Sequence, residues 1–185
     1  MISPISSNSI GIKQSHEKAK MTISEGLIHS LGNNPKFSIF KAFVLPYGIR
    51  NTTPQYQATI SDVYKVITSP KYKIITEKLR SFANPNEAEE YKKTSFDYAT
   101  SSGIFSKRED ASLINHSGLI CIDLDKLENL SGIKQKIITS DVVPELMFIS
   151  PLGNGLKVIY RIDVSGASHL MYFKALGEYF NRSLI

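Results

Sequence analysis

The stretch that decides the fold of the second half is SGLICIDLD, residues 117–125, where a short apolar run ends in two aspartates one residue apart. In a β-strand, side chains at positions i and i+2 point to the same face, about 6.6 Å apart along the chain. Ile120, Ile122 and Leu124 fill one face of such a strand. Asp123 and Asp125 are therefore expected to project together from the other face.

A second apolar run, residues 146–162, is interrupted by SPLGNGLK at residues 150–157. Gly153 and Gly155 allow the backbone to make a tight turn and to approach a neighbour closely. In such a turn free N–H groups form an anion site, the Ser150 hydroxyl can donate, and Lys157 supplies a positive charge to a phosphate. The alternative is an ordinary β-hairpin, for which a Gly-Asn-Gly turn between two strands is a common signal.

The elements around these two segments alternate in a recognisable order. We expect a strand over 118–124, a helix over 127–138, strands over 146–150 and 156–162, and an amphipathic helix over 167–180. The order β-α-β-β-α predicts an α+β fold with a ferredoxin-like, or RRM-like, core that lacks its last strand. The chain stops where that strand is due, so we expect a fragment of a longer polypeptide, unless the amino-terminal half supplies the sixth element.

The first half is divided by glycine, proline and polar segments. Residues 1–35 are expected to be peripheral, with a short helix near 15–29. A strand is expected over 37–45, and helices are expected from Ile60, over 72–82 and over 86–93. Residues 99–106 are expected to form turns, followed by a short helix that reaches Asn115. The predicted organisation is thus an amino-terminal α/β unit over 36–116, integrated with the RRM-like half over 117–185.

Composition places the chain among globular proteins, with 42% apolar residues in 185. The sequence predicts no membrane span and no secretory signal, so the expected location is the cytoplasm. Cys121 is the single cysteine and is expected to act as a small buried hydrophobe. Residues 1–116 carry fifteen basic and ten acidic residues, which accounts for the whole net charge of +5 and favours a polyanionic partner.

The two aspartates indicate metal chemistry. Carboxylate oxygens suit Mg²⁺ or Mn²⁺, and ions held there can activate a hydroxyl and stabilise a leaving pyrophosphate. In the alternative interpretation they are polar residues at a strand end, with Asp125 capping the helix that follows.

Taken together, these motifs resemble the archaeo-eukaryotic primase and primase-polymerase superfamily. More closely, residues 102–108, 116–119, 123–125 and 150–161 resemble the bacterial VirE amino-terminal domain family of mobile-element proteins. The resemblance implies metal-dependent nucleotidyl transfer to a 3′-hydroxyl, with single-stranded or primer-template nucleic acid and a nucleoside triphosphate as partners. It also implies a helicase-like region further along the full-length chain.

The resemblance assigns roles residue by residue. Asp123 and Asp125 would be the metal motif, Ser150, Gly153, Gly155 and Lys157 would contact the triphosphate, and Arg108 would be a basic contact from the other half. Two departures count against catalysis by the fragment alone. Lys157 stands where primases have histidine, and the third acidic motif is expected beyond Ile185.

Two other functions remain open. The first is a catalytically inactive nucleic-acid-binding module on the same fold, and the second is an unrelated Asp-x-Asp enzyme such as a phosphohydrolase or glycosyltransferase. Tyr91, Phe96 and Tyr98, beside basic residues, are expected to pack in the core or to stack nucleobases. His116 and His169 are expected to be structural hydrogen-bonding residues.

Overall fold

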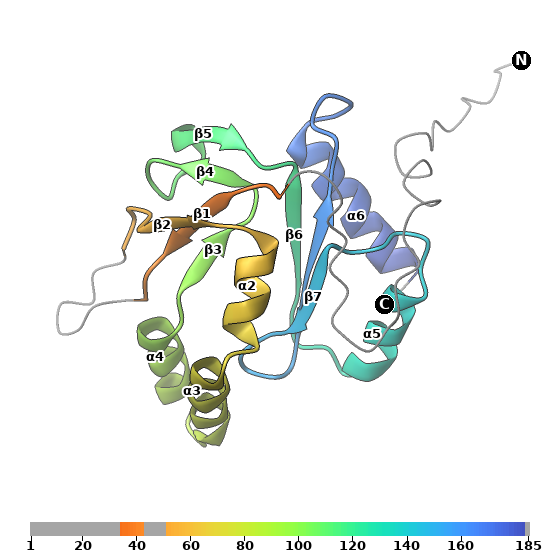
Figure 1. Ribbon diagram of the computed structural model, residues 1–185. Coiled ribbons are helices and arrows are strands. Elements are labelled where there is room, and N and C mark those ends of the chain that lie inside the picture. The colour runs from red at the N-terminus through yellow and green to blue at the C-terminus, as the bar shows by residue number, and fades with distance from the viewer. Residues whose placement is uncertain (1–33, 43–50, 184–185) are drawn as a thin grey trace, which may run out of the picture.

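The computed structural model describes residues 34–42 and 51–183 and shows a mixed α+β architecture (Figure 1). The helix expected near 15–29 and the end of the strand expected over 37–45 lie outside the described residues. None of the helices in these two segments combines the length and apolarity needed to cross a bilayer.

The amino-terminal half contains a three-stranded antiparallel sheet with helices beside it. Its strand order is β2-β1-β3, with Ser38 opposite both Gln57 and Thr100. The elements are β1 (Phe37–Phe40), β2 (Tyr56–Ala58), α2 (Ile60–Ile67), α3 (Pro70–Ser81), α4 (Pro85–Ser95) and β3 (Tyr98–Thr100).

The start of α2 confirms the helix expected from Ile60 and shows a capping box. The Thr59 side chain accepts from the Asp62 backbone N–H, and the Asp62 carboxylate accepts from the Thr59 N–H at 3.0 Å. These bonds satisfy donors that the first helical turn leaves unpaired. The hydrogen bonds from Thr59 hold the pKa of the Asp62 carboxyl below its usual value.

The segment between the two halves is more regular than the sequence predicts. Within residues 99–106, β3 and β4 (Gly103–Phe105) take part in strand pairing, and β4 pairs with β5 (Leu113–His116). A single 3-10 turn, Asp110–Ser112, stands where a helix reaching Asn115 was expected. The turn interpretation of 99–106 and the helix to Asn115 are therefore wrong.

The second half follows the expected order. It contains β6 (Leu119–Leu124), α5 (Leu130–Ile138), β7 (Leu146–Ile149), β8 (Leu156–Arg161) and α6 (His169–Ser183). The sheet order is β6-β8-β7, and β8 pairs antiparallel with both neighbours. In Figure 1, α5 and α6 lie on one side of this sheet and the amino-terminal half lies on the other.

Alternation along the strands builds a separate core on each face of this sheet. Ile120, Ile122 and Leu124 of β6 belong to a buried cluster with Ile137 of α5 and Phe180 of α6. The opposite face contributes Leu119, Leu146 and Ile159 to a second cluster, which also contains Phe37, Ile39, Ala58 and Ile60 of the amino-terminal half. The central sheet is thus buried on both faces, and the amino-terminal half shares a core with it.

Candidate functional site

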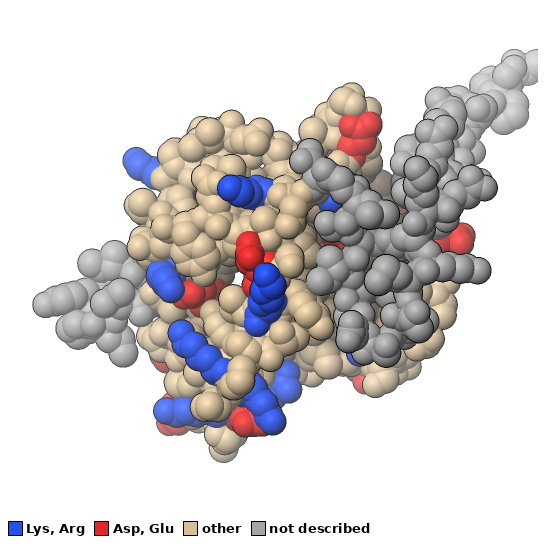
Figure 2. All heavy atoms as spheres, in the orientation of Figure 1, with Lys and Arg blue, Asp and Glu red and all other residues tan. Residues whose placement is uncertain are grey.

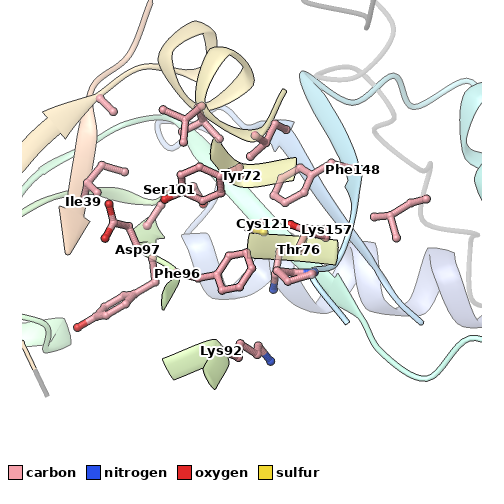
Figure 3. Close-up of a pocket in the computed structure, with 18 of the residues that line it drawn as sticks. Ile39, Tyr72, Thr76, Lys92, Phe96, Asp97, Ser101, Cys121, Phe148 and Lys157 are labelled. Atoms are coloured by element: carbon pink, nitrogen blue, oxygen red, sulfur yellow. The ribbon is translucent and has the colours of Figure 1, made fainter. Parts of the chain in front are cut away.

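A cleft of about 860 Å³ lies between the central sheet and the amino-terminal half. The sheet contributes Cys121, Phe148 and Lys157, and the opposite wall comes from β1 to β3 and α2 to α4. Figure 3 shows Tyr72, Phe96 and Phe148 around the space beside Cys121 and Lys157. A cavity of this size is in the usual range for a small-molecule site.

Lys157 is the charged residue of the sheet wall, and Asp123 is its ion-pair partner. They stand directly opposite in the β6–β8 register, and the Lys157 ammonium is bonded to the Asp123 carboxylate. Strand alternation places both on the face opposite α5 and α6, since their neighbours Ile122, Leu124 and Val158 belong to the helix-side core. Lys157 lines the cleft, and Asp123 reaches it through this ion pair.

Asp125 lies just after the end of β6 and is exposed. A Cβ placed on Gly155 would be 3.3 Å from Asp125 Oδ1, so this carboxylate lies beside the turn between β7 and β8. The cap of α5 is Asn129, whose side chain accepts from the Gly132 N–H at 2.9 Å. The alternative in which Asp125 caps that helix is therefore wrong.

The turn between β7 and β8 is a hairpin, which was the alternative interpretation of this segment. The Ser150 N–H donates to the Gly155 carbonyl and the Gly153 N–H donates to the Ser150 carbonyl, both at 2.8 Å. These two amides are used within the turn and are not available to an anion. Gly153 has φ +88°, a conformation that favours glycine.

Arg80 of α3 joins this turn to the amino-terminal half. Its guanidinium donates to the Pro151 carbonyl at 2.9 Å and to the Ser150 carbonyl at 3.3 Å, and it lies against Gly153. The Ser150 hydroxyl is buried and makes no hydrogen bond within the described structure. The sequence carried no signal for Arg80, because the contact joins residues about seventy positions apart.

The wall opposite the sheet is aromatic. Tyr72 of α3 meets Phe96 edge to face, with ring centroids 5.9 Å apart. Burial raises the pKa of Tyr72 to about 12, and the negative charge of Asp97 adds to the rise, so its hydroxyl stays protonated at neutral pH. Aromatic faces of this kind stack nucleobases without regard to sequence.

Phe96 and Tyr98 line the cleft, whereas Tyr91 packs against Phe82, with ring centroids 5.2 Å apart. Two members of the expected stacking set are therefore at the cleft and the third is packed away from it. Arg108 also lines the cleft and lies over the Tyr98 ring, 4.2 Å from its centroid. The role of Arg108 as a basic contact from the other half stays a prediction.

The electrostatic field of the cleft is only modestly positive. Six basic residues line it, Lys73, Arg80, Lys92, Lys93, Arg108 and Lys157, beside four acidic residues, Asp62, Glu77, Glu89 and Asp97. Figure 2 shows Lys and Arg side chains gathered over α3 and α4, with acidic side chains among them. Exposed pairs such as Lys73–Glu77 contribute little individually.

Asp123 and Asp125 are the residues that the sequence predicted as ligands of a divalent cation. Among residues 34–42 and 51–183, no group of three or more His, Cys, Asp or Glu side chains is placed to hold a metal ion. Two carboxylates nevertheless fit Mg²⁺, which often takes one or two protein carboxylates and completes its shell with phosphates and water.

Cys121 is largely buried beneath Lys157, and burial raises the pKa of its thiol to about 11. The thiolate, which is the nucleophilic form, is therefore scarce at neutral pH. This agrees with the expected role of Cys121 as a small apolar residue.

His116 and His169 are direct partners, which the sequence did not indicate. Their Nε2 and Nδ1 atoms are 3.0 Å apart, and His116 Nδ1 accepts from the Gly118 N–H at 2.9 Å. Since a neutral imidazole has one donor and one acceptor nitrogen, His116 Nε2 donates to His169 Nδ1. The bond ties the entry of β6 to the start of α6 and requires both rings to be neutral.

The pKa of each histidine lies below its usual value, through burial in both cases and, for His116, also through His169. As pH falls below about 6.5, the two histidines become protonated in the unfolded chain before they do so in the folded protein. Protonation therefore favours the unfolded state, and the free energy of unfolding decreases as pH falls. We expect urea denaturation to give a lower free energy of unfolding at pH 5.5 than at pH 7.5. In the His116→Gln/His169→Gln variant this pH dependence is expected to shrink, and an unchanged dependence would contradict the assignment.

Comparison with known proteins gives one family match. The model of the family described as BT4734-like, N-terminal domain matches residues 90–178, just under half of the chain, and this family is related to VirE N-terminal and primase-polymerase-like domains. No curated protein and no solved structure matches the chain significantly. The matched segment contains every residue that the sequence assigned to the site, whereas Arg80 and Tyr72 lie outside it.

Proposed function

We propose that this chain is a primase-polymerase-like domain of a mobile-element replication protein, which binds a nucleoside triphosphate and a nucleic-acid 3′ end in the cleft and supports nucleotidyl transfer. The observation that carries the proposal is the pairing of Asp123 with Lys157 at the wall of a cleft with aromatic rings around it. Nucleotidyl transfer uses a carboxylate that binds a divalent cation, a positive charge for the phosphates and aromatic rings that stack on the base.

The topology of the second half supports the proposal. In a ferredoxin-like or RRM-like sheet, the first and second strands are parallel and the third lies between them. The order β6-β8-β7, with both pairings antiparallel and two helices on one face, agrees with that arrangement. The family match over residues 90–178 supports the same relationship.

Each group of residues at the cleft has a separate role in the proposed reaction. Asp123 and Asp125 would hold Mg²⁺ or Mn²⁺ at the end of β6, where the ion would neutralise phosphate charge and activate the attacking hydroxyl. Lys157 and Arg108 are positive charges at the cleft for the triphosphate or the nucleic-acid backbone. Tyr72, Phe96 and Phe148 offer ring faces and edges to the base.

A second function is favoured by one observation. Because Asp123 is neutralised by Lys157, the site is also suited to binding nucleic acid without catalysis. In this inactive binding module the cleft holds single-stranded DNA or RNA through basic and aromatic residues. Binding would then be sensitive to salt and indifferent to the two aspartates.

The two functions are separated by one set of measurements on the full chain and its Asp123→Asn/Asp125→Asn variant. We expect Mn²⁺-dependent nucleotide incorporation on a primer-template to fall at least about tenfold in the variant, because the ion loses its protein ligands. Binding of labelled single-stranded DNA, compared at low and moderate salt, is expected to persist in both. Binding without incorporation by either protein favours the inactive module, and loss of both from the unmutated chain contradicts both functions.

A further inference from the structure

The Lys157–Asp123 pair occupies the position at which a cation would meet the first aspartate. The ammonium is bonded to Asp123 Oδ2, and the two residues are held opposite one another by the β6–β8 register. A divalent cation at the same oxygen would be placed against the lysine's positive charge. Such a cation therefore binds to Asp123 only when the ammonium has moved away.

Lys157 is able to move. Its side chain is 31% exposed and that of Asp123 is 45% exposed, and an ion pair in contact with water is weak. The lysine has a flexible four-carbon stem and lines the cleft. A phosphate group in the cleft offers more negative charge and more acceptor oxygens than one carboxylate, so it competes well for the ammonium.

The number of ligands that the protein can offer the metal ion also indicates that cation and phosphate bind together. Asp123 and Asp125 supply too few oxygens to fill the shell of Mg²⁺ or Mn²⁺, and phosphate oxygens make up the rest. A triphosphate thus provides missing ligands for the ion and removes Lys157 from Asp123 in one event. Cation and triphosphate are expected to bind together and only weakly alone.

We infer that Lys157 is a tethered counter-ion that keeps Asp123 closed to divalent cations until a phosphate-bearing ligand draws the ammonium away. The inference rests on the proposed function in taking Asp123 and Asp125 as metal ligands and the triphosphate as that phosphate-bearing ligand. It differs from a purely structural role, in which Lys157 only stabilises the β6–β8 pairing.

The test is calorimetric titration of Mn²⁺ into the full chain in the absence of any phosphate. Lys157→Met keeps the length of the side chain and removes its charge, and it is expected to bind Mn²⁺ at least about tenfold more tightly than the unmutated protein. Lys157→Arg keeps the charge and is expected to behave as the unmutated protein. Lys134→Met removes an exposed lysine of α5, on the other side of the sheet from the cleft, and is expected to leave Mn²⁺ affinity unchanged.

The double variant Lys157→Met/Asp123→Asn locates the effect, because the gain in Mn²⁺ affinity is expected to vanish when Asp123 is neutralised. Circular dichroism checks that each variant is folded. Equal Mn²⁺ affinity of the unmutated protein and Lys157→Met overturns the inference, and so does a gain that survives Asp123→Asn.

The proposed function is judged separately, from the anisotropy of a fluorescent ATP analogue with the same samples. Nucleotide binding without a gain in Lys157→Met removes the counter-ion role and leaves the proposed function standing. If Lys157→Met gains Mn²⁺ affinity but no sample binds the nucleotide, Lys157 does block the cation from Asp123, and the triphosphate is not the ligand that displaces it.

Discussion

Gly155→Ala is expected to lower the free energy of unfolding by about 2–3 kcal/mol, as overpacking of a close contact does. A Cβ at this position would lie 2.5 Å from the Leu124 carbonyl oxygen and 3.3 Å from the Asp125 Cα. Both are backbone atoms at the end of β6, so the strand end or the turn must shift to make room. The substitution thus acts on the place where the candidate metal ligands meet the turn.

The matched control is Gly177→Ala in α6, where the added Cβ would meet nothing within 4 Å. That change is expected to stabilise the protein by about 0.5–1 kcal/mol, because alanine loses less backbone entropy in a helix. Urea denaturation of both variants measures the difference. Equal stability of Gly155→Ala and the unmutated chain would contradict the close approach of the turn to β6.

The elements that sequence reasoning located are those with local signals. The capping box at Thr59 needs four consecutive residues, and it begins α2 as expected. The alternation in β6 and the helical periodicity of α6 are also read within one segment. The order β6, α5, β7, β8, α6 was predictable because each member has its own periodicity and is bounded by turn residues.

Strands β2, β3, β4 and β5 were missed because their stability is not local. They are three or four residues long, and β3 is held by pairing with β1, about sixty residues earlier in the chain. The Phe105 N–H donates to the buried Ser38 hydroxyl at 2.9 Å, a contact that no short window of sequence contains. Serine and glycine in this segment indicated turns, and tertiary pairing overrode that preference.

In the candidate site too, local motifs were predictable from the sequence, whereas contacts between distant residues were not. Asp123, Asp125 and the glycine turn were predictable from spacing, whereas the direct pairing of Asp123 with Lys157 depends on strand register. Arg80 and Tyr72 come from α3, which the sequence motifs did not assign to the site. Motifs indicated which residues carry chemistry, and only the fold showed which of them neutralise one another.

Phe37→Ala is expected to lower the free energy of unfolding by about 3–5 kcal/mol, the cost of removing a large buried side chain. Phe37 is fully buried in β1. It belongs to the cluster that contains Ile60 of α2 and Leu119 and Ile159 of the central sheet. Its loss therefore leaves a cavity in the core that the two halves share.

The control for this change is Phe173→Ala in α6, whose ring is 50% exposed and which is expected to alter stability by no more than about 0.5 kcal/mol. Far-ultraviolet circular dichroism and tyrosine fluorescence follow the urea transition of each variant. Phe37 of the amino-terminal half packs in the same buried cluster as Leu119 and Ile159 of the central sheet. We therefore expect both probes to show a single coincident transition, which Phe37→Ala shifts as a whole. Two separate transitions, of which only one moves, would show that residues 36–116 fold independently of the half that carries Asp123 and Lys157.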